Sequence, residues 1–308
     1  MRASFALVLL ASVGLVAAQQ SAPPRSPEPA QRPFHAGVDL TTVNATVVDR
    51  DGHLVKGLPR EAFDVYEDGV LQTTTQFTNE RVPVSLGILF DTSDSMFGRR
   101  IDQAREAITR FVADILNPAD EYAILSFNHQ PHILTRWTTD RPAAARVMQP
   151  LKPWGATAIY DTIVATMPLV EVRNRQRAAL IVLSDGDDTA SDSTQRDVRS
   201  SLLRSDAFIY AVAIDPSDRF PINVDVNRTA LLELTSQSGG RTLLVHDIAD
   251  TISALSEIAE ELNNQYLIGY SSSKPLDGQF HSIRVRVRDS DYRVRHRNGY
   301  VAVARRRS

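Results

Sequence analysis

The stretch VPVSLGILFDTSDSM, residues 82–96, decides the fold of this 308-residue chain. It contains an apolar run, Val84 to Phe90, which has the length and composition of a strand buried on both faces. Side chains with oxygen donors follow at once, at Asp91, Ser93 and Ser95. In open α/β sheets, ligand sites lie at the carboxyl ends of the strands. The stretch therefore predicts a buried parallel strand that ends in a ligand site.

Strand and helix patterns alternate after this stretch. Apolar residues recur at helical spacing from Ile101 to Ile115. Further strands are predicted at residues 122–127, 131–137, 178–183, 207–214 and 241–245, and further helices at 142–148, 159–170, 195–203, 228–236 and 247–263. Continuous apolar strands separated by amphipathic helices imply a mainly parallel sheet covered on both faces. We expect a doubly wound, Rossmann-like α/β domain over residues 82–264.

Shorter strand patterns, in which apolar and polar residues alternate, flank this domain on both sides. They cover residues 43–47, 63–66 and 71–77 before it, and residues 266–270, 283–287 and 292–303 after it. Neither group buries enough apolar surface alone, and the ends of a domain often lie close together. We therefore expect residues 37–80 and 265–303 to form one small antiparallel β domain into which the α/β domain is inserted.

The first residues have the pattern of an export signal. Arg2 supplies a positive charge, the apolar run from Phe5 to Val16 is short for a bilayer span, and small residues follow at Ala17 and Ala18. We interpret residues 1–18 as a signal peptide, with an uncleaved anchor as the alternative, and the Pro-rich residues 19–36 as a linker. A secreted or periplasmic protein without stable membrane insertion is expected after cleavage.

Composition excludes several kinds of site. The chain has no cysteine, so disulfides, thiolate metal sites and cysteine nucleophiles are excluded. Its formal net charge of −3 gives no indication of a nucleic-acid partner or of binding to an anionic membrane surface.

Two further segments carry oxygen donors. Asp185 follows the predicted strand 178–183, and Thr157 lies just before a predicted helix. Carboxylates mixed with hydroxyls suit a hard cation such as Mg²⁺ rather than Zn²⁺ or Cu²⁺. A DxSxS run alone is more often a helix cap, and that interpretation is compatible with a metal site. His129 and His132 are expected to be hairpin residues, because no third ligand accompanies them.

These segments together resemble a known site. The DxSxSM run at Asp91–Met96, the GxTA-like run at Gly155–Ala158 and the SDG run around Asp185 resemble the metal-ion-dependent adhesion site of von Willebrand factor type A (VWA) domains and integrin inserted domains. The flanking runs FDVYEDG (63–69), YLIGY (266–270) and RVRHRNGY (293–300) resemble the VWA-related secreted proteins of bacteria.

The resemblance implies a ligand set and a kind of partner. Ser93 and Ser95 would bind the metal through their hydroxyls, Thr157 directly or through water, and Asp91 and Asp185 mostly through bridging waters. The implied ion is Mg²⁺, with Mn²⁺ and Ca²⁺ as alternatives, and its open position would take an Asp or Glu carboxylate of a partner protein. Asp94 departs from the pattern, because many members have glycine there, and its role stays open, as do those of Asp187 and Asp188.

A metal-dependent hydrolase is the alternative from another functional class. An Asp after a buried strand also begins the site of aspartyl-nucleophile phosphatases, but those need a second carboxylate two residues on, where this chain has Ser93. Asp91 and Asp185 could form an acid–base pair, yet nothing in the sequence indicates that either titrates near neutrality. No GxSxG motif is present. We therefore expect a non-enzymatic, cation-dependent adhesion or assembly module.

Overall fold

The computed structural model describes residues 40–215, 226–289 and 291–303. The predicted signal peptide, residues 1–18, and the predicted linker, residues 19–36, lie outside the described residues. Within these described ranges, no helix combines the length and the apolar character needed to cross a bilayer.

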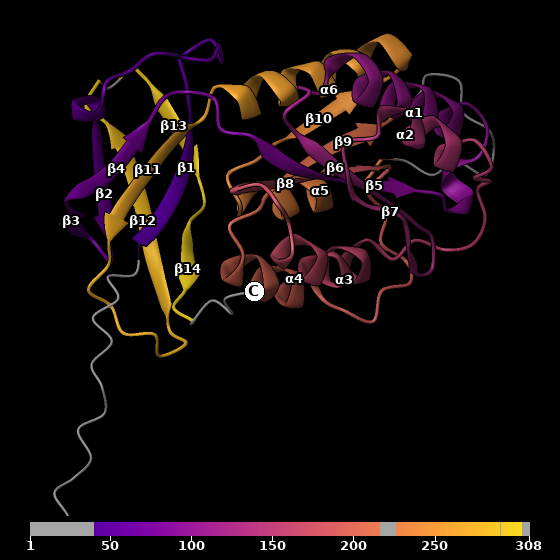
Figure 1. Ribbon diagram of the computed structural model, residues 1–308. Helices are drawn as coiled ribbons and strands as arrows, with labels where there is room; N and C mark the ends of the chain where they lie inside the picture. The colour runs from indigo at the N-terminus through magenta and orange to yellow at the C-terminus, as the bar shows by residue number, and fades with distance from the viewer. Residues whose placement is uncertain (1–39, 216–225, 290, 304–308) are drawn as a thin grey trace, which may run out of the picture. The chain divides into compact units, whose positions relative to one another are not determined.

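A six-stranded sheet forms the centre of the α/β domain, in the order β10-β9-β8-β5-β6-β7 (Figure 1). Adjacent strands are parallel, except that β6 and β7 form an antiparallel hairpin. The predicted mainly parallel sheet is confirmed. Its strands are β5 (Val84–Asp91), β6 (Glu121–Phe127), β7 (Pro131–Thr138), β8 (Arg177–Ser184), β9 (Phe208–Ile214) and β10 (Thr242–Val245).

Helices cover both faces of this sheet. Figure 1 shows α1, α2 and α6 above it and α3 and α4 below it, and α5 packs into the same core cluster as α3 and α4. Successive side chains of a strand point to opposite faces. Ile181 of β8 therefore packs toward α1, α2 and α6, whereas Leu180 and Val182 pack toward the other three helices, which is why β8 is apolar at nearly every position. The helices are α1 (Arg99–Arg110), continued by the π-helical turn η3 (Phe111–Ile115), α2 (Arg141–Met148), α3 (Ile159–Glu171), α4 (Gln195–Arg204), α5 (Arg228–Ser236) and α6 (Ile248–Asn263); the 3-10 turn η2 (Asp94–Met96) precedes α1.

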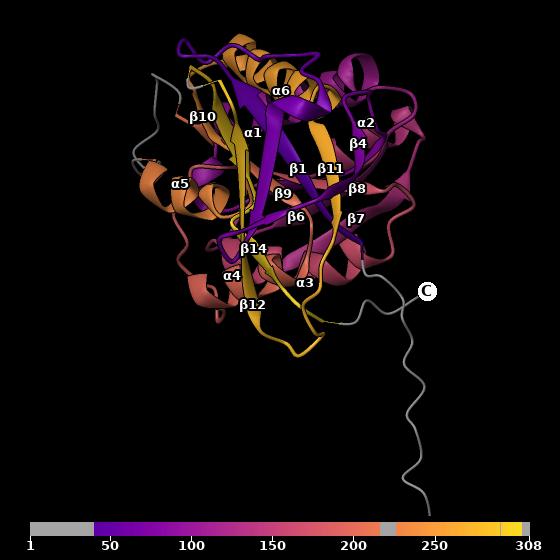
Figure 2. The ribbon, with the colours of Figure 1, turned by 90° about the vertical axis from the view of Figure 1, so that its left-hand side faces the viewer.

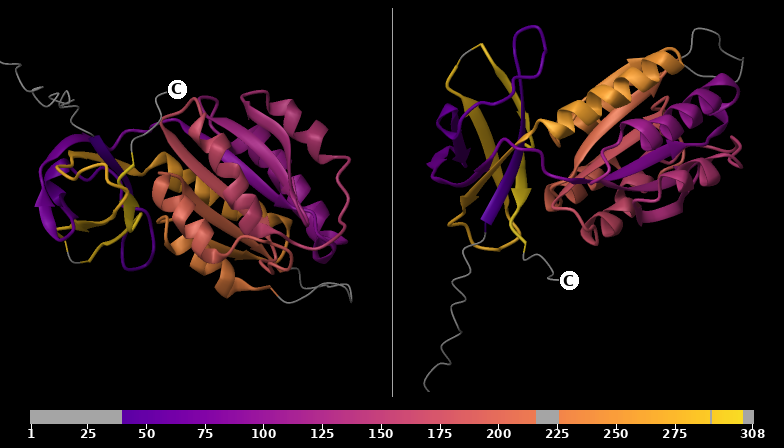
Figure 3. Two further views of the ribbon diagram at one scale, coloured as in Figure 1. Left: turned by 90° about the horizontal axis from the view of Figure 1, so that it is seen from below. Right: turned by 45° about the horizontal axis from the view of Figure 1, so that its top comes forward.

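Two four-stranded antiparallel sheets form the β domain, in the orders β13-β1-β11-β4 and β14-β12-β2-β3 (Figure 2). Each sheet combines strands from before and after the α/β domain, because β1 pairs with β11 and β13, and β2 pairs with β12. The two sheets face each other (Figure 3) around a shared core that includes Val43, Phe63, Tyr266 and Val285. The strands are β1 (Leu40–Val48), β2 (Phe63–Glu67), which follows the short turn η1 (Arg60–Ala62), β3 (Val70–Gln72), β4 (Thr74–Thr78), β11 (Tyr266–Ser271), β12 (Phe280–Val287), β13 (Arg293–His296) and β14 (Gly299–Val301).

Two predicted strands are in fact divided between these sheets. Residues 71–77 contribute to both β3 and β4, and residues 292–303 form β13 and β14. Residues 72–76 are all polar and residues 296–299 carry no apolar side chain, so the alternation lapses at both breaks, and the predicted strands wrongly ran across them. At the second break, a Cβ on Gly299 would lie 2.3 Å from the carbonyl oxygen of His281, so the chain changes sheets where only glycine fits.

A buried polar cluster connects the β domain to the first residue of β8. Arg177 Nη1 donates to the carbonyl oxygen of Leu262 at 2.7 Å, and its Nη2 donates to Gln265 Oε1. Gln265 Nε2 donates in turn to Thr46 Oγ1 at 3.0 Å and to the Tyr210 hydroxyl at 3.2 Å. Because Arg177 begins β8, this connection lies at the opposite end of the strand from Ser184 and leaves the carboxyl edge of the sheet for the site.

Candidate metal centre

The strand ends that carry the predicted aspartates lie side by side. β5 ends at Asp91 and β8 ends at Ser184, just before Asp185. The two strands are parallel neighbours, with Phe90 opposite Leu183. Parallel strands deliver their carboxyl ends to the same edge of a sheet. The fold therefore brings Asp91 and Asp185 together although 93 residues separate them in the chain.

The third predicted segment, the loop before α3, is tied to the same edge by backbone hydrogen bonds. The Trp154 amide donates to the Thr92 carbonyl at 2.9 Å, and the Asp94 amide donates to the Gly155 carbonyl at 2.8 Å. The carbonyl of Thr157 accepts from two amides in the loop after β8, each at 2.9 Å. All three loops are thus fixed to one another by main-chain contacts that do not depend on an ion.

Four of the five predicted ligands are joined directly through their side chains or an adjacent amide. Asp91 Oδ1 accepts from the amide of Ser93 at 2.8 Å, and the hydroxyl oxygens of Ser93 and Ser95 lie 3.0 Å apart. The Ser95 hydroxyl also hydrogen-bonds Asp185. Asp91, Ser93, Thr157 and Asp185 are buried, and Ser95 is half-buried. The fifth, Thr157, reaches this edge through the backbone contacts described above.

Both carboxyl groups have raised pKa values. Burial, and then the charge of Asp185, raises the pKa of Asp91 to about 7, against the lowering effect of its hydrogen bonds. Burial also raises the pKa of Asp185, which the Ser95 hydroxyl and the Arg100 guanidinium partly offset. The sequence carried no indication of this shift in the pKa of Asp91, because it did not show how completely the side chain is buried.

The donor set fits a hard cation. Asp185 Oδ1 is buried and has no hydrogen-bond partner among the described residues, although a carboxylate oxygen away from water needs one. The hydroxyls of Ser93 and Ser95 and the carboxyl of Asp91 belong to the same cluster, and oxygen donors of these types are the ligands that Mg²⁺ and Ca²⁺ take. A divalent ion would satisfy this oxygen and favour the ionised form of both acids.

Two residues at the site were not predicted to act there. Ser184 Oγ donates to Asp91 Oδ2 at 2.5 Å and accepts from the Gly186 amide at 2.9 Å. Arg100 Nη1 donates to Asp185 Oδ2 at 2.7 Å, and both side chains of this ion pair are fully buried. Ser184 carried a sequence signal, since it directly precedes Asp185. Arg100 carried none, because the adjacent Arg99 is the same residue type and is exposed.

The additional acids have separate roles. Asp94 is exposed, and its charge faces solvent rather than the buried cluster. Asp188 Oδ2 accepts from the Tyr160 amide at 3.0 Å and from Ser191 Oγ at 2.8 Å, so it stabilises the first turn of α3. Asp187 is half-buried, and its charge contributes to the raised pKa of Asp185.

The histidines of the β6–β7 hairpin lie beside the site without joining it. His129 is exposed, and its ring contacts the Trp154 ring edge to face, with centroids 4.8 Å apart. Trp154 itself is 55% exposed. His132 is half-buried in β7. Within the described residues, neither histidine belongs to a group of side chains with metal-ligand spacing.

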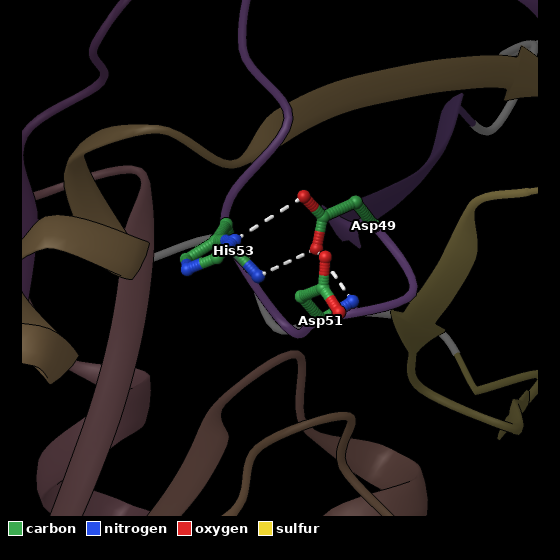
Figure 4. Close-up of side chains that lie close together, drawn as sticks. All are labelled: Asp49, Asp51 and His53. Carbon is green, nitrogen blue, oxygen red and sulfur yellow. Dashed lines mark hydrogen bonds and ion pairs between the residues drawn. The ribbon is translucent and has the colours of Figure 1, made fainter.

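One other group with metal-ligand spacing lies in the β domain, at the turn after β1. Asp49, Asp51 and His53 point toward one another there (Figure 4). Asp49 Oδ1 accepts from the amides of Asp51 and His53 at 2.9 and 2.8 Å. These bonds lower the pKa of Asp49, with the His53 amide as the largest contribution. Local bonds of this kind stabilise a turn, so the group is explained by the hairpin.

The family comparison agrees with the fold. Residues 86–187, which include all five predicted ligands, match the family described as von Willebrand factor type A domain. The chain contains a VWA domain. The inter-alpha-trypsin inhibitor heavy chain H4 of Homo sapiens is 23% identical over 209 residues, covering 63% of this chain and 22% of that protein. The corresponding Mus musculus protein is 23% identical over 216 residues, covering 65% and 22%. The chain thus spans about a fifth of the length of these relatives.

Solved structures are similar in fold. The von Willebrand factor type A protein from Catenulispora acidiphila aligns with a TM-score of 0.52 at 14% identity, over 88% of this chain and 75% of that one. The conserved hypothetical protein BatB from Bacteroides thetaiotaomicron aligns with a TM-score of 0.50 at 18% identity, over 58% of this chain and 97% of that one. The VWA fold is therefore shared at low sequence identity.

Proposed function

We propose that this protein is an exported, cation-dependent binding module that captures an Asp or Glu carboxylate of a partner protein. The ion is Mg²⁺, or Mn²⁺ or Ca²⁺ in its place, held by Asp91, Ser93, Ser95, Thr157 and Asp185. The observation that carries the proposal is the buried, unpaired Oδ1 of Asp185 beside two hydroxyls and a second buried carboxyl. VWA domains are common protein-interaction modules, which supports a role in adhesion or assembly.

The chain's own residues prepare the site for a carboxylate. Ser93 and Ser95 offer neutral oxygens, so they hold a cation without cancelling its charge. Asp91 is kept in place by Ser184 and by the Ser93 amide, and its negative charge is set back in the buried cluster. When bound, the ion supplies a positive charge with a coordination position for an incoming anion. A partner carboxylate meets that charge at the edge of the sheet where the three loops converge.

The site is tested by its effect on thermal stability. At a Mg²⁺ concentration about 100 times its Kd, binding stabilises the fold by about 2.7 kcal/mol, which raises the melting temperature by about 5–10 °C in a domain of this size. The double variant Ser93→Ala, Ser95→Ala is expected to lose this increase while keeping the fold. A matched control, Ser200→Ala with Ser253→Ala, changes two exposed helical serines and should keep the increase. If Mg²⁺ stabilises both double variants equally, the ligands are misassigned.

Partner capture is tested by a pull-down from the native envelope with Mg²⁺ and with chelator. A partner retained only with Mg²⁺, and lost in the Ser93→Ala, Ser95→Ala variant, supports the proposal. Retention that is the same with chelator contradicts cation-dependent capture. Mutation of surface acids on the retained partner then tests whether a carboxylate is the group that binds.

A metal-dependent hydrolase is the second candidate, and the raised pKa of Asp91 favours it. Against it, both Asp91 oxygens accept hydrogen bonds and the side chain is fully buried, so a substrate cannot reach them without opening the site. A screen with phosphatase and esterase substrates separates the two functions. Mg²⁺-dependent turnover that disappears in Asp91→Ala would favour the hydrolase over the binding module.

We further propose the domain division that follows from the strand patterns. Residues 82–264 form the VWA domain, and residues 37–80 with 265–303 form a mount that presents it. Residues 1–18 direct export to the periplasm or the medium, and residues 19–36 act as a linker. Amino-terminal sequencing of the exported protein tests the cleavage: a new terminus near residue 19 supports it, and an intact Met1 indicates an anchor.

A further inference from the structure

Arg100 is a fully buried cation at the site. Its Nη1 donates to Asp185 Oδ2 at 2.7 Å and to the carbonyl oxygen of Ser95 at 3.0 Å. Arginine is almost never completely buried unless it is paired. The neighbouring Arg99, one residue earlier in α1, is exposed, so burial at this position is specific to Arg100.

The position of Arg100 is not explained by helix formation. It lies in the first turn of α1, where the helix dipole disfavours a positive charge. The acids of the site explain it instead. Asp91 and Asp185 place two carboxyl groups in a buried cluster, and the Arg100 guanidinium donates a hydrogen bond to one of them.

We propose that Arg100 is a built-in cation that competes with the divalent ion for the Asp185 carboxylate and thereby weakens cation binding. This inference rests on the proposed cation site. Without a divalent ion, the guanidinium neutralises Asp185 and keeps the loops together. With one, two positive charges interact with the same carboxylate.

Two opposing effects decide whether substitution of Arg100 strengthens or weakens cation binding. Removing a group that orients a metal ligand weakens metal binding by about 10–100-fold. Removing a like charge strengthens it. Repulsion between a single and a double charge, even about 8 Å apart at an effective dielectric constant of about 20, corresponds to roughly a thousandfold in the binding constant. Salt screens it only weakly, because the Arg100 and Asp185 side chains are fully buried. The repulsion dominates, so a neutral residue at position 100 should tighten cation binding by about 10–100-fold.

The test is calorimetric titration of the full chain with Mg²⁺ and Mn²⁺. Arg100→Gln should bind the cation about 10–100-fold more tightly than wild type and melt lower than wild type in chelator. Arg100→Lys, which keeps the charge, and Arg99→Gln, which removes a charge in the exposed position, should both stay within about threefold of wild type. A neutral variant that folds only when the cation is present also supports the inference.

Two results of this titration would overturn it in distinguishable ways. Equal or weaker binding by Arg100→Gln, with binding by wild type intact, refutes the competition and leaves the cation site standing. Absence of binding in every variant and in wild type refutes the cation site together with the inference.

A third measurement needs no neutral variant. Titration of wild type with Mg²⁺ should shift the NMR signal of the Arg100 side-chain Nε–H, assigned by its loss in Arg100→Lys, in proportion to occupancy. A signal that does not move while the cation binds contradicts competition for Asp185.

Discussion

Ser184→Ala is expected to destabilise the fold and to loosen the site. The Ser184 side chain is fully buried, its hydroxyl donates to Asp91 Oδ2 at 2.5 Å, and its oxygen accepts from the Gly186 amide at 2.9 Å. Loss of a hydrogen bond to a charged group costs about 1.5–3 kcal/mol, and a buried amide left without an acceptor costs about 1–3 kcal/mol. Because both losses come from one side chain and the structure can relax around it, we expect a total of about 2–4 kcal/mol.

The measurement is urea unfolding followed by circular dichroism, in chelator. Ser253→Ala is the matched control, because Ser253 is exposed on α6 and should change stability by less than about 0.5 kcal/mol. In thermal melts the Ser184→Ala protein should unfold about 5–12 °C below wild type. Its Mg²⁺ affinity should also fall, by about 10–100-fold, because Asp91 loses the group that orients it. If Ser184→Ala unfolds together with Ser253→Ala, the hydroxyl does not hold Asp91 and our account of the site is wrong.

Three further predictions concern the β domain, the buried acids and the sheet. A fragment of residues 82–308 lacks β1 and β2, which pair with β11 and β12, and should melt well below the full chain; equal melting would refute a shared β domain. Because the pKa values of Asp91 and Asp185 are raised, the metal-free fold is most stable at low pH, where both groups are protonated, and it loses this stability as pH rises from about 4 to about 7. Mg²⁺ affinity should rise over the same pH range. Thermal melts and calorimetric titrations that do not change between about pH 4 and about pH 7 would contradict this prediction. Gly240→Ala places a Cβ 1.8 Å from the Ile209 carbonyl oxygen and should lower the free energy of unfolding in urea by more than about 3 kcal/mol. The control Gly278→Ala should lower it by about 1 kcal/mol, because its Cβ meets no atom but its φ is +78°. Similar values for the two variants would be inconsistent with the packing of β10 on β9.

The serine substitutions and the Arg100 substitution are expected to have opposite effects on cation binding at the same site. Ser93→Ala with Ser95→Ala removes ligands and should abolish stabilisation by Mg²⁺, whereas Arg100→Gln removes a competitor and should increase it. A single site cannot give both results unless hydroxyls, carboxylates and guanidinium meet around one ion.

Local sequence determined the order and type of the elements. The short apolar run 178–183 indicates a strand buried on both faces, and the 3.6-residue spacing from Ile101 to Ala107 indicates a helix with one buried side. The oxygen donors at Asp91, Thr157 and Asp185 were visible for the same reason, because each directly follows a strand or precedes a helix.

Only the tertiary structure decided where strands break, how deeply the acids are buried and which charged side chains meet. The breaks that divide residues 71–77 and 292–303 depend on which strand is available for pairing in each sheet, and local sequence does not specify that partner. The raised pKa of Asp91 depends on burial by residues far along the chain, and sequence spacing carries no measure of burial. Arg99 and Arg100 are chemically identical neighbours, and only the placement of Asp185 beside the start of α1 selects one of them as the buried partner of the site.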